Sequence, residues 1–460
     1  MACETEQIKE QAAKQLEAAA EKLGDSRTDS VESEPPTSEP PRSTPASVPP
    51  ELESRLAEVL RGDVFSFQLF QLDVDALSMG LETGTLVQPL VDEQNKLLEE
   101  ELEVRRIQLR APEHTRGILR SGPLTKPETR TVPLPPERNY LLGECSREEY
   151  RNQTDKISER AIVCGSLSIL DADGSMISGI VVHPKIGTTF FEPVDQLLGG
   201  QSYPHWHLAY NIRGTHPVIF SEEEVPRGSA DINSSQRTFH KLASPLPDFT
   251  FKGTSIVLDG DVRFYNINTS TVWARQEAAH LAVWLIYLLI EPLSSADWGL
   301  DIPIKGQEVW ISGGPTTTDG DNLINEITDP NYFLLNSITD TELHYLFVGY
   351  SVTDLYGKAA GIGTDSGGFG GGAQRNHAFG DGRSSSSLKT RWVVMAHEVG
   401  HLIGGRHSDG VTSGCAGGGL SSLCGASLMP AGSAGSPEIR SAYFSDANDD
   451  NISAVLGGLP

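Results

Sequence analysis

The spacing of apolar and polar residues predicts a mainly β region in the first half of the chain. Residues 65–72 alternate between apolar and polar side chains, as half-buried strands do. Two apolar runs at 161–170 and 178–182 flank the turn sequence Asp-Ala-Asp-Gly and predict a β-hairpin. Strand-like segments follow at 188–193 and 207–211. We therefore expect residues 56–245 to be mainly β.

Two segments within this region lack the strand pattern. Residues 93–110 are highly charged and helical in composition, so we expect a helix there. Residues 111–139 combine several prolines with many charges, which is typical of a connector.

Strands and helices alternate in the second half of the chain and predict an α/β domain over 246–460. One expected helix, 272–290, has a nearly continuous apolar face, and a second covers 391–403. Strands are expected at 254–259, 300–304, 308–311 and 345–350.

Composition adds a tail and excludes some classes of function. Residues 1–55 are acidic and rich in Pro, Ser and Glu, so we expect them to be disordered. The net charge is −26, from 36 basic and 62 acidic residues, which disfavours nucleic-acid binding. The longest apolar run, 281–290, is half the ~20 residues that a membrane-spanning helix needs. We expect no transmembrane segment, and the first residues show no secretory leader.

The expected helix at 391–403 carries a metal-binding motif, H-E-x-x-H-x-x-G-x-x-H. His397 and His401 lie four residues apart, so a helix presents both imidazoles to one metal ion. Glu398 can reach a water on that metal without being a ligand. Gly404 permits the turn that brings in His407 as a third ligand. Three protein ligands leave one position open, which is typical of catalytic Zn²⁺.

At these residues the chain resembles the metzincin metalloproteases. Met429, in the sequence Ser-Leu-Met-Pro, matches the methionine-containing turn beneath their zinc. Cys415 and Cys424 match a cysteine pair of the reprolysin (adamalysin, ADAM-like) branch, and the resemblance implies a disulfide between them. Residues 356–363 match the edge strand with which that family pairs its substrates. The implied fold is a mixed sheet with an active-site helix and a Met-turn.

The resemblance implies a zinc-dependent endopeptidase that is made as a zymogen. Its substrates would be proteins or peptides, hydrolysed by a zinc-bound water with Glu398 as general base. Residues 56–245 would be a propeptide that precedes the catalytic domain. The implied disulfide favours an extracellular destination. The alternative is a catalytically inactive binding protein that has kept the metalloprotease fold.

Latency has two possible mechanisms. Reprolysin propeptides place a cysteine thiolate on the zinc, but no cysteine occurs between residues 165 and 414. Cys145 or Cys164 could reach the metal from an unexpected position. The interpretation that we prefer is steric, with residues 221–250 lying along the substrate cleft.

Overall fold

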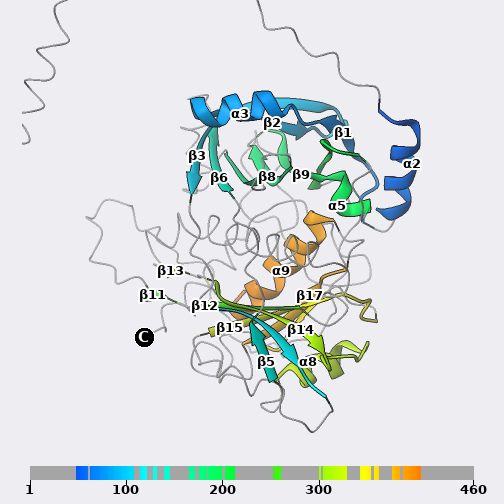
Figure 1. Cartoon of the computed structure of the whole chain (residues 1–460), viewed down its shortest axis with the longest axis vertical. Coiled ribbons are helices and arrows are strands. Elements are labelled where there is room, and N and C mark those ends of the chain that lie inside the picture. The colour runs from blue at the N-terminus through cyan, green and yellow to red at the C-terminus, as the bar shows by residue number, and fades with distance from the viewer. Residues whose placement is uncertain are drawn as a thin grey trace, which may run out of the picture. The chain divides into compact units, whose positions relative to one another are not determined.

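The described part of the chain consists of two large sheets and a few helices, so it is mostly β. It comes from a computed structural model (Figure 1). The described residues are 48–60, 63–107, 114–121, 128–131, 139–145, 165–170, 176–183, 185–198, 203–212, 252–253, 255–260, 300–301, 304–328, 342–353, 357–361, 376–383 and 387–405.

The first sheet has eight antiparallel strands, in the order β1-β10-β9-β8-β7-β6-β3-β2. The expected hairpin is confirmed as β7 and β8, which pair from Gly165 opposite Val182 to Leu170 opposite Ile177. The other strand-like segments are confirmed as β1, β9 and β10. The strands are β1 (Gln68–Gln71), β2 (Thr85–Val91), β3 (Leu97–Ile107), β6 (Asn139–Cys145), β7 (Gly165–Leu170), β8 (Ile177–His183), β9 (Gly187–Pro193) and β10 (Trp206–Asn211).

The helix expected at 93–110 is wrong, because this segment forms β3. It pairs with β2 on one side and with β6 on the other. Leu102 is fully buried, whereas its neighbours Glu101 and Glu103 are exposed. The helical preference of Glu and Leu is a weak prior, and pairing with two neighbouring strands overrides it.

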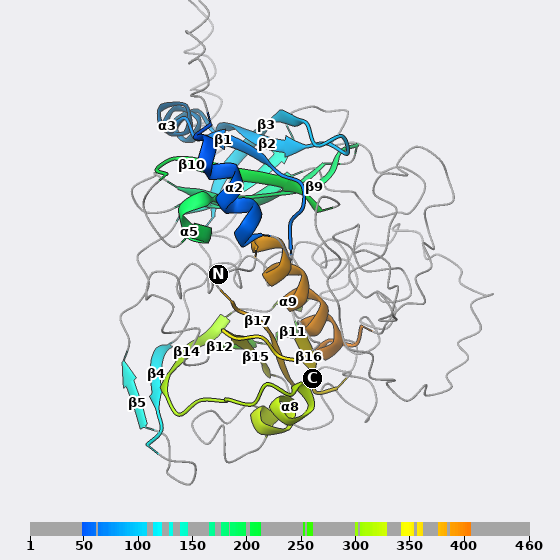
Figure 2. The same ribbon diagram turned by 90° about the vertical axis from the view of Figure 1, so that its right-hand side faces the viewer.

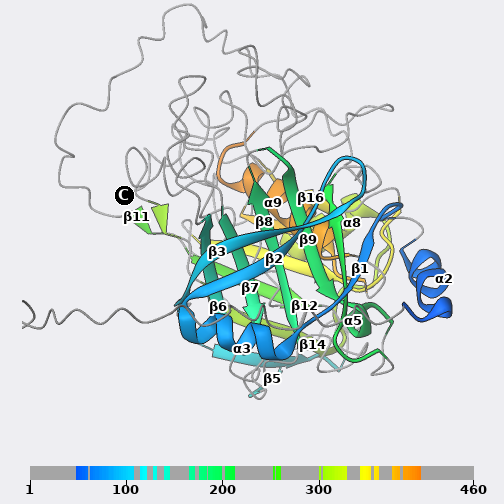
Figure 3. The ribbon, with the colours of Figure 1, turned by 90° about the horizontal axis from the view of Figure 1, so that it is seen from above.

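The first sheet curls so that β2 lies against β9 and β10, and helix α3 (Val74–Thr83) packs on β2 (Figure 3). Two hydrogen bonds join β2 to β9 and β10. The Val91 amide donates to Thr189 Oγ1 at 3.0 Å, and Asn211 Nδ2 donates to the Val91 carbonyl at 2.9 Å. The short helix α5 (Val194–Leu198) follows β9. Strands β7, β9 and β10 are buried at every position.

Helix α2 (Pro50–Val59) begins inside the tail expected at 1–55. Leu52 and Leu56 lie one turn apart and are fully buried, so the helix has an apolar face to pack. The prediction of disorder is therefore wrong from residue 50 onward, and residues 1–47 lie outside the described part.

The second sheet has seven strands, in the order β16-β17-β15-β12-β14-β4-β5. Five strands are parallel, and the strand at each edge is antiparallel to its neighbour. The expected strands are confirmed at β12, β14 and β15. The strands are β4 (His114–Leu119), β5 (Glu128–Thr131), β12 (Ser255–Gly260), β14 (Ile304–Ser312), β15 (Glu342–Val348), β16 (Gly357–Ala359) and β17 (His377–Asp381); β11 (Lys252–Gly253) and β13 (Leu300–Asp301) form a separate short pair.

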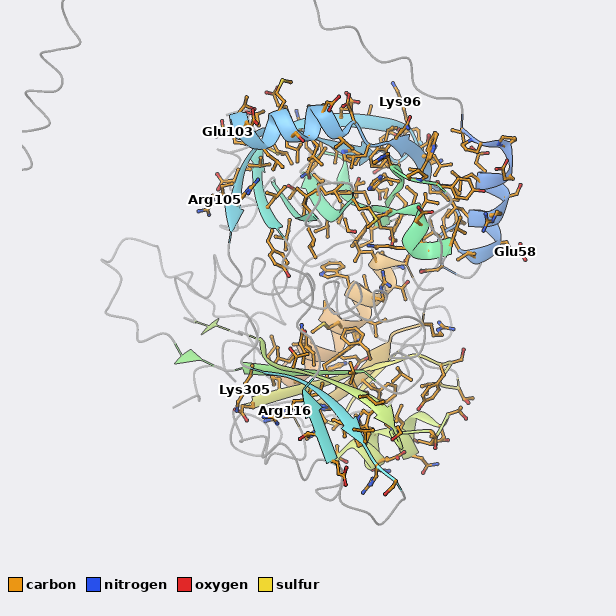
Figure 4. All side chains as sticks on the ribbon, in the orientation of Figure 1. Glu58, Lys96, Glu103, Arg105, Arg116 and Lys305 are labelled. Carbon is orange, nitrogen blue, oxygen red and sulfur yellow. The ribbon has the colours of Figure 1, made fainter. Side chains whose placement is uncertain are left out.

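Strands β4 and β5 come from the segment expected to be a connector, so that prediction is wrong. β4 pairs in parallel with β14, and Arg116 of β4 forms an ion pair with the buried Glu308 of β14 at 3.7 Å. Figure 2 shows β4 and β5 beside β14, and Figure 4 labels Arg116 there. The second sheet thus includes strands from both sides of the boundary predicted at 245/246.

Two helices cover opposite faces of the second sheet. Helix α9 (Leu388–Leu402) packs on β15, β16 and β17, and α8 (Gly320–Thr328) packs on β16 and β17. Tyr345 and Phe347 belong to the core beneath α9, whereas Leu346 belongs to the core beneath α8. The helix expected at 391–403 is confirmed as α9, and the one expected at 272–290 lies outside the described residues. In the described part, no helix is long and apolar enough to cross a membrane.

Candidate metal centre

The H-E-x-x-H part of the motif, His397–His401, lies on a helix that is buried along its whole length. All fifteen residues of α9 are buried, and the helix contacts strands of both sheets (Figures 1 and 2). The N-cap residue is Ser387, whose side chain accepts a hydrogen bond from the Thr390 amide at 3.2 Å. This is the usual way in which a serine begins a helix.

The two histidines of α9 lie as ligands of one metal ion would. His397 Nε2 and His401 Nε2 are 3.2 Å apart. Two nitrogens on a tetrahedral zinc with Zn–N bonds of about 2.0–2.1 Å are separated by about 3.3 Å. The pair therefore fits two positions of a tetrahedral zinc.

The end of α9 fixes the orientation of His401. Gly404 adopts the left-handed region at φ 110°, and the Gly405 amide donates to the Gly400 carbonyl at 2.7 Å. This turn places the Gly405 carbonyl 2.9 Å from His401 Nδ1. When Nδ1 carries the proton and donates it there, Nε2 keeps its lone pair for a metal.

Glu398 is almost completely buried, with 2% of its surface exposed. Its carboxylate accepts a hydrogen bond from the Ala359 amide of β16. Burial raises the pKa of Glu398 well above its usual range, while the Lys358 charge and the Ala359 hydrogen bond act in the opposite direction. Burial therefore makes the Glu398 carboxylate bind a proton more tightly than an exposed glutamate does.

A pair of glycines allows α9 to approach the edge strand closely. Gly357 of β16 faces Gly380 of β17, and a Cβ atom on either would collide with Val394 of α9. A Cβ on Gly357 would also lie 2.9 Å from Glu398 Oε1. The missing side chain of Gly357 therefore leaves the space that the Glu398 carboxylate occupies.

The substitution Gly357→Ala is expected to displace the Glu398 carboxylate, because the new Cβ would lie 2.9 Å from Glu398 Oε1. If Glu398 serves as a general base, kcat should fall by about tenfold or more, since such a base contributes about 10²–10⁴. Overpacking should also cost about 1–3 kcal/mol of stability. The matched control is Gly143→Ala, since its Cβ would meet Ser166 Oγ in the first sheet, away from α9. Thermal unfolding and steady-state kinetics of both variants test this. Equal kcat values would contradict the role given to Gly357.

Strand β16 lies at the edge of the second sheet, in the segment 356–363 where the family resemblance implied an edge strand. In the described part of the sheet it pairs with β17 alone. Lys358 forms an ion pair with Asp321 of α8, whereas Ala359 packs towards the core beneath α9. The edge strand is thus held between the two helices.

Several predicted site residues lie outside the described residues: His407, Met429, Cys415 and Cys424. Among the residues that are described, no group of three or more His, Cys, Asp or Glu side chains could hold a metal ion. The structure therefore brings together Glu398 and two of the three predicted ligands.

Two residues outside the motif have structural roles. Cys145 is fully buried and disulfide-bonded, so while the bond is intact it offers no thiolate to a metal. His207 is also fully buried; its Nε2 accepts from the Ile177 amide at 3.2 Å and its Nδ1 lies 2.9 Å from the His205 carbonyl. Burial lowers the pKa of His207 to about 4, so it is neutral at physiological pH.

The sequence did not reveal the residues that surround Glu398. Gly357, Lys358 and Ala359 come from an edge strand about 40 positions earlier in the chain. Their only signal was the resemblance of residues 356–363 to a substrate-pairing strand, which says nothing about contact with the carboxylate.

No protein-family model matches the chain, and the comparison with curated proteins gives no match. Among solved structures, metalloproteinase-II from Bacteroides fragilis is similar over 86% of this chain and 97% of its own, at 11% identity and a TM-score of 0.42. A chaperone–substrate complex is similar over 45% of this chain and 34% of its own, at 14% identity and a TM-score of 0.28. Both scores are too low to support an inference about this chain.

Proposed function

We propose that the protein is a zinc-dependent endopeptidase. The observation that carries the proposal is the 3.2 Å separation of His397 Nε2 and His401 Nε2, with Glu398 beside them on the same helix. This combination is the two-histidine, one-glutamate arrangement of zinc peptidases. His407 is proposed as the third ligand and Met429 as the residue of the turn beneath the metal.

The two histidines and the glutamate of α9 have separate roles in the proposed reaction. When bound, Zn²⁺ supplies a Lewis acid that polarises the scissile carbonyl and acidifies water. His397 and His401 hold the ion, and the Gly405 carbonyl keeps His401 in the tautomer that can do so. Glu398 takes the proton of the attacking water and passes it to the leaving amine.

The edge strand supplies a way to hold an extended substrate. A peptide could add to the outer edge of β16 through main-chain hydrogen bonds, since in the described part of the sheet this strand pairs with β17 alone. The Ala359 amide already donates to Glu398, so this edge lies next to the proposed base. A protein or peptide substrate is therefore proposed.

The protein is proposed to be made as a zymogen and exported. The disulfide of Cys145 supports an oxidising, extracellular compartment, as would the proposed bridge between Cys415 and Cys424. The Cys145 disulfide also argues against the alternative in which the Cys145 thiolate binds the zinc. The steric mechanism, with residues 221–250 along the cleft, is the one that we propose.

The experiment adds zinc to the full-length protein and measures hydrolysis of a quenched-fluorescence peptide library. A second sample carries a specific protease site within residues 221–250 and is cut there first. We expect hydrolysis that rises on cutting, stops with a chelator and returns with zinc. Zinc-loaded, cut protein that hydrolyses nothing would favour the alternative, an inactive binding protein of metalloprotease fold.

A further inference from the structure

Backbone amides at the start of α9 donate hydrogen bonds to residues of the first sheet and of the segment before it. The Ser387 amide donates to Asp63 Oδ2 at 2.6 Å, and the Leu388 amide donates to Glu192 Oε1 at 2.9 Å. The amides at the start of a helix have no partner within the helix, and when buried they need one. Residues far away in the sequence supply these partners.

Tyr210 of β10 completes the arrangement. Its hydroxyl accepts from the Lys389 amide at 3.2 Å and donates to Glu192 Oε1 at 2.7 Å. The other Glu192 oxygen lies 3.5 Å from Arg391 Nη2, which adds an ion pair to the first turn. Three consecutive amides of the zinc helix are thus bound by residues of the N-terminal half.

Packing follows the same path as the hydrogen bonds. Phe190 of β9 stacks on Tyr210 with ring centroids 5.9 Å apart, and it also lies 5.4 Å from the ring of Trp392 in α9. These residues belong to one hydrophobic core that includes side chains of both sheets and of α2. Among the described residues, α9 thus shares one hydrophobic core with the N-terminal half.

The second sheet depends on the N-terminal half as well. Strands β4 and β5 belong to the N-terminal half and extend the sheet that carries β16 and β17. Removing them would expose the β14 edge and leave Glu308 without its Arg116 partner. The N-terminal half therefore contributes to the sheet beneath the zinc helix and to the start of that helix.

We infer that residues 48–212 remain bound to the C-terminal half in the active enzyme. Asp63, Glu192 and Tyr210 are then positioning residues for helix α9. The inference rests on the proposed function. It differs from the expected propeptide, which would leave after activation. After a cut between the two halves of the chain, the N-terminal half would stay in place.

The first test uses the variant with a specific protease site within residues 221–250. After cutting, size-exclusion chromatography under native conditions and zinc analysis follow both fragments. We expect them to elute together with zinc bound. A C-terminal fragment that elutes alone, folded and zinc-loaded, would overturn the inference. Separation with loss of zinc or aggregation would support it, because the C-terminal half would then need its partner.

The second test compares Tyr210→Phe with Ser168→Ala. Both substitutions remove one buried hydroxyl of the first sheet. Ser168 Oγ accepts a hydrogen bond from Gln88 Nε2 at 2.9 Å, which lies within the first sheet and not at α9. Hydrogen exchange of the amides at 387–391 is measured in zinc-loaded protein. Tyr210→Phe should speed that exchange about tenfold, the effect of one lost buried hydrogen bond. Equal exchange in the two variants would contradict the inference.

A further variant separates charge from hydrogen bonding. Glu192→Gln keeps an oxygen that can accept from the Leu388 amide, whereas Glu192→Ala removes it. Exchange should therefore rise less in Glu192→Gln than in Glu192→Ala, and the reverse order would contradict the positioning role. None of these readouts needs peptide hydrolysis. A protein that binds zinc, shows these differences and hydrolyses nothing would refute the proposed function alone.

Discussion

The substitution Glu398→Gln is expected to reduce peptide hydrolysis by about 10²–10⁴, the usual contribution of a general base. The amide keeps an oxygen that can accept from the Ala359 amide, so the local packing should survive. It cannot take a proton from water at neutral pH. Zinc content should stay at the level of the unchanged protein, because Glu398 is not a ligand.

Kinetics and metal analysis of the same preparation test this result. The control is Glu326→Gln, which alters a half-buried glutamate of α8 that has no place in the proposed site. It should leave both activity and zinc content unchanged. If Glu398→Gln lost less than about tenfold, far below the range of general-base catalysis, the assigned role would be wrong. If it lost zinc, Glu398 would act in binding.

His401→Ala should weaken zinc binding by more than about 100-fold. Loss of a residue that only hydrogen-bonds a metal ligand costs up to about 100-fold, and loss of a ligand itself should cost more. The residue supplies one of two nitrogens that lie 3.2 Å apart, and its Nδ1 contacts the Gly405 carbonyl just after the helix ends. Hydrolysis should be lost with the metal. Competition with a chromophoric chelator measures the affinity.

His407→Ala tests the proposed third ligand in the same assay. It should also lower zinc affinity, and a variant with full metal content and unchanged affinity would remove His407 from the ligand set. The control is His205→Asn, since asparagine tolerates the positive φ of 66° found at this position. His205 lies outside α9, and its replacement should not affect the metal.

The sequence predicted the helix that carries the site because that information is local. His397, Glu398 and His401 lie within one turn, and Gly404 marks the end of the helix. The hairpin of β7 and β8 was equally local, with two apolar runs on either side of a turn. Such features need no knowledge of the rest of the chain.

The parts that could not be predicted depend on contacts between distant residues. β4 looks like a connector until β14 pairs with it, about 190 residues later. β3 has a helical composition, and its two neighbours in the sheet make it a strand. Asp63 lies 324 positions before the Ser387 amide that it accepts from, and no pattern around it indicates that role.

Because α9 is completely buried, we expect its folding not to depend on metal binding. Small zinc domains assemble around the ion, so that removing the metal unfolds them. Here the helix packs against strands of both sheets, is capped at its start and is followed by a turn at Gly404. His397 and His401 are thus held close together by the protein itself. A chelator should leave an intact apoprotein that takes up zinc again without refolding.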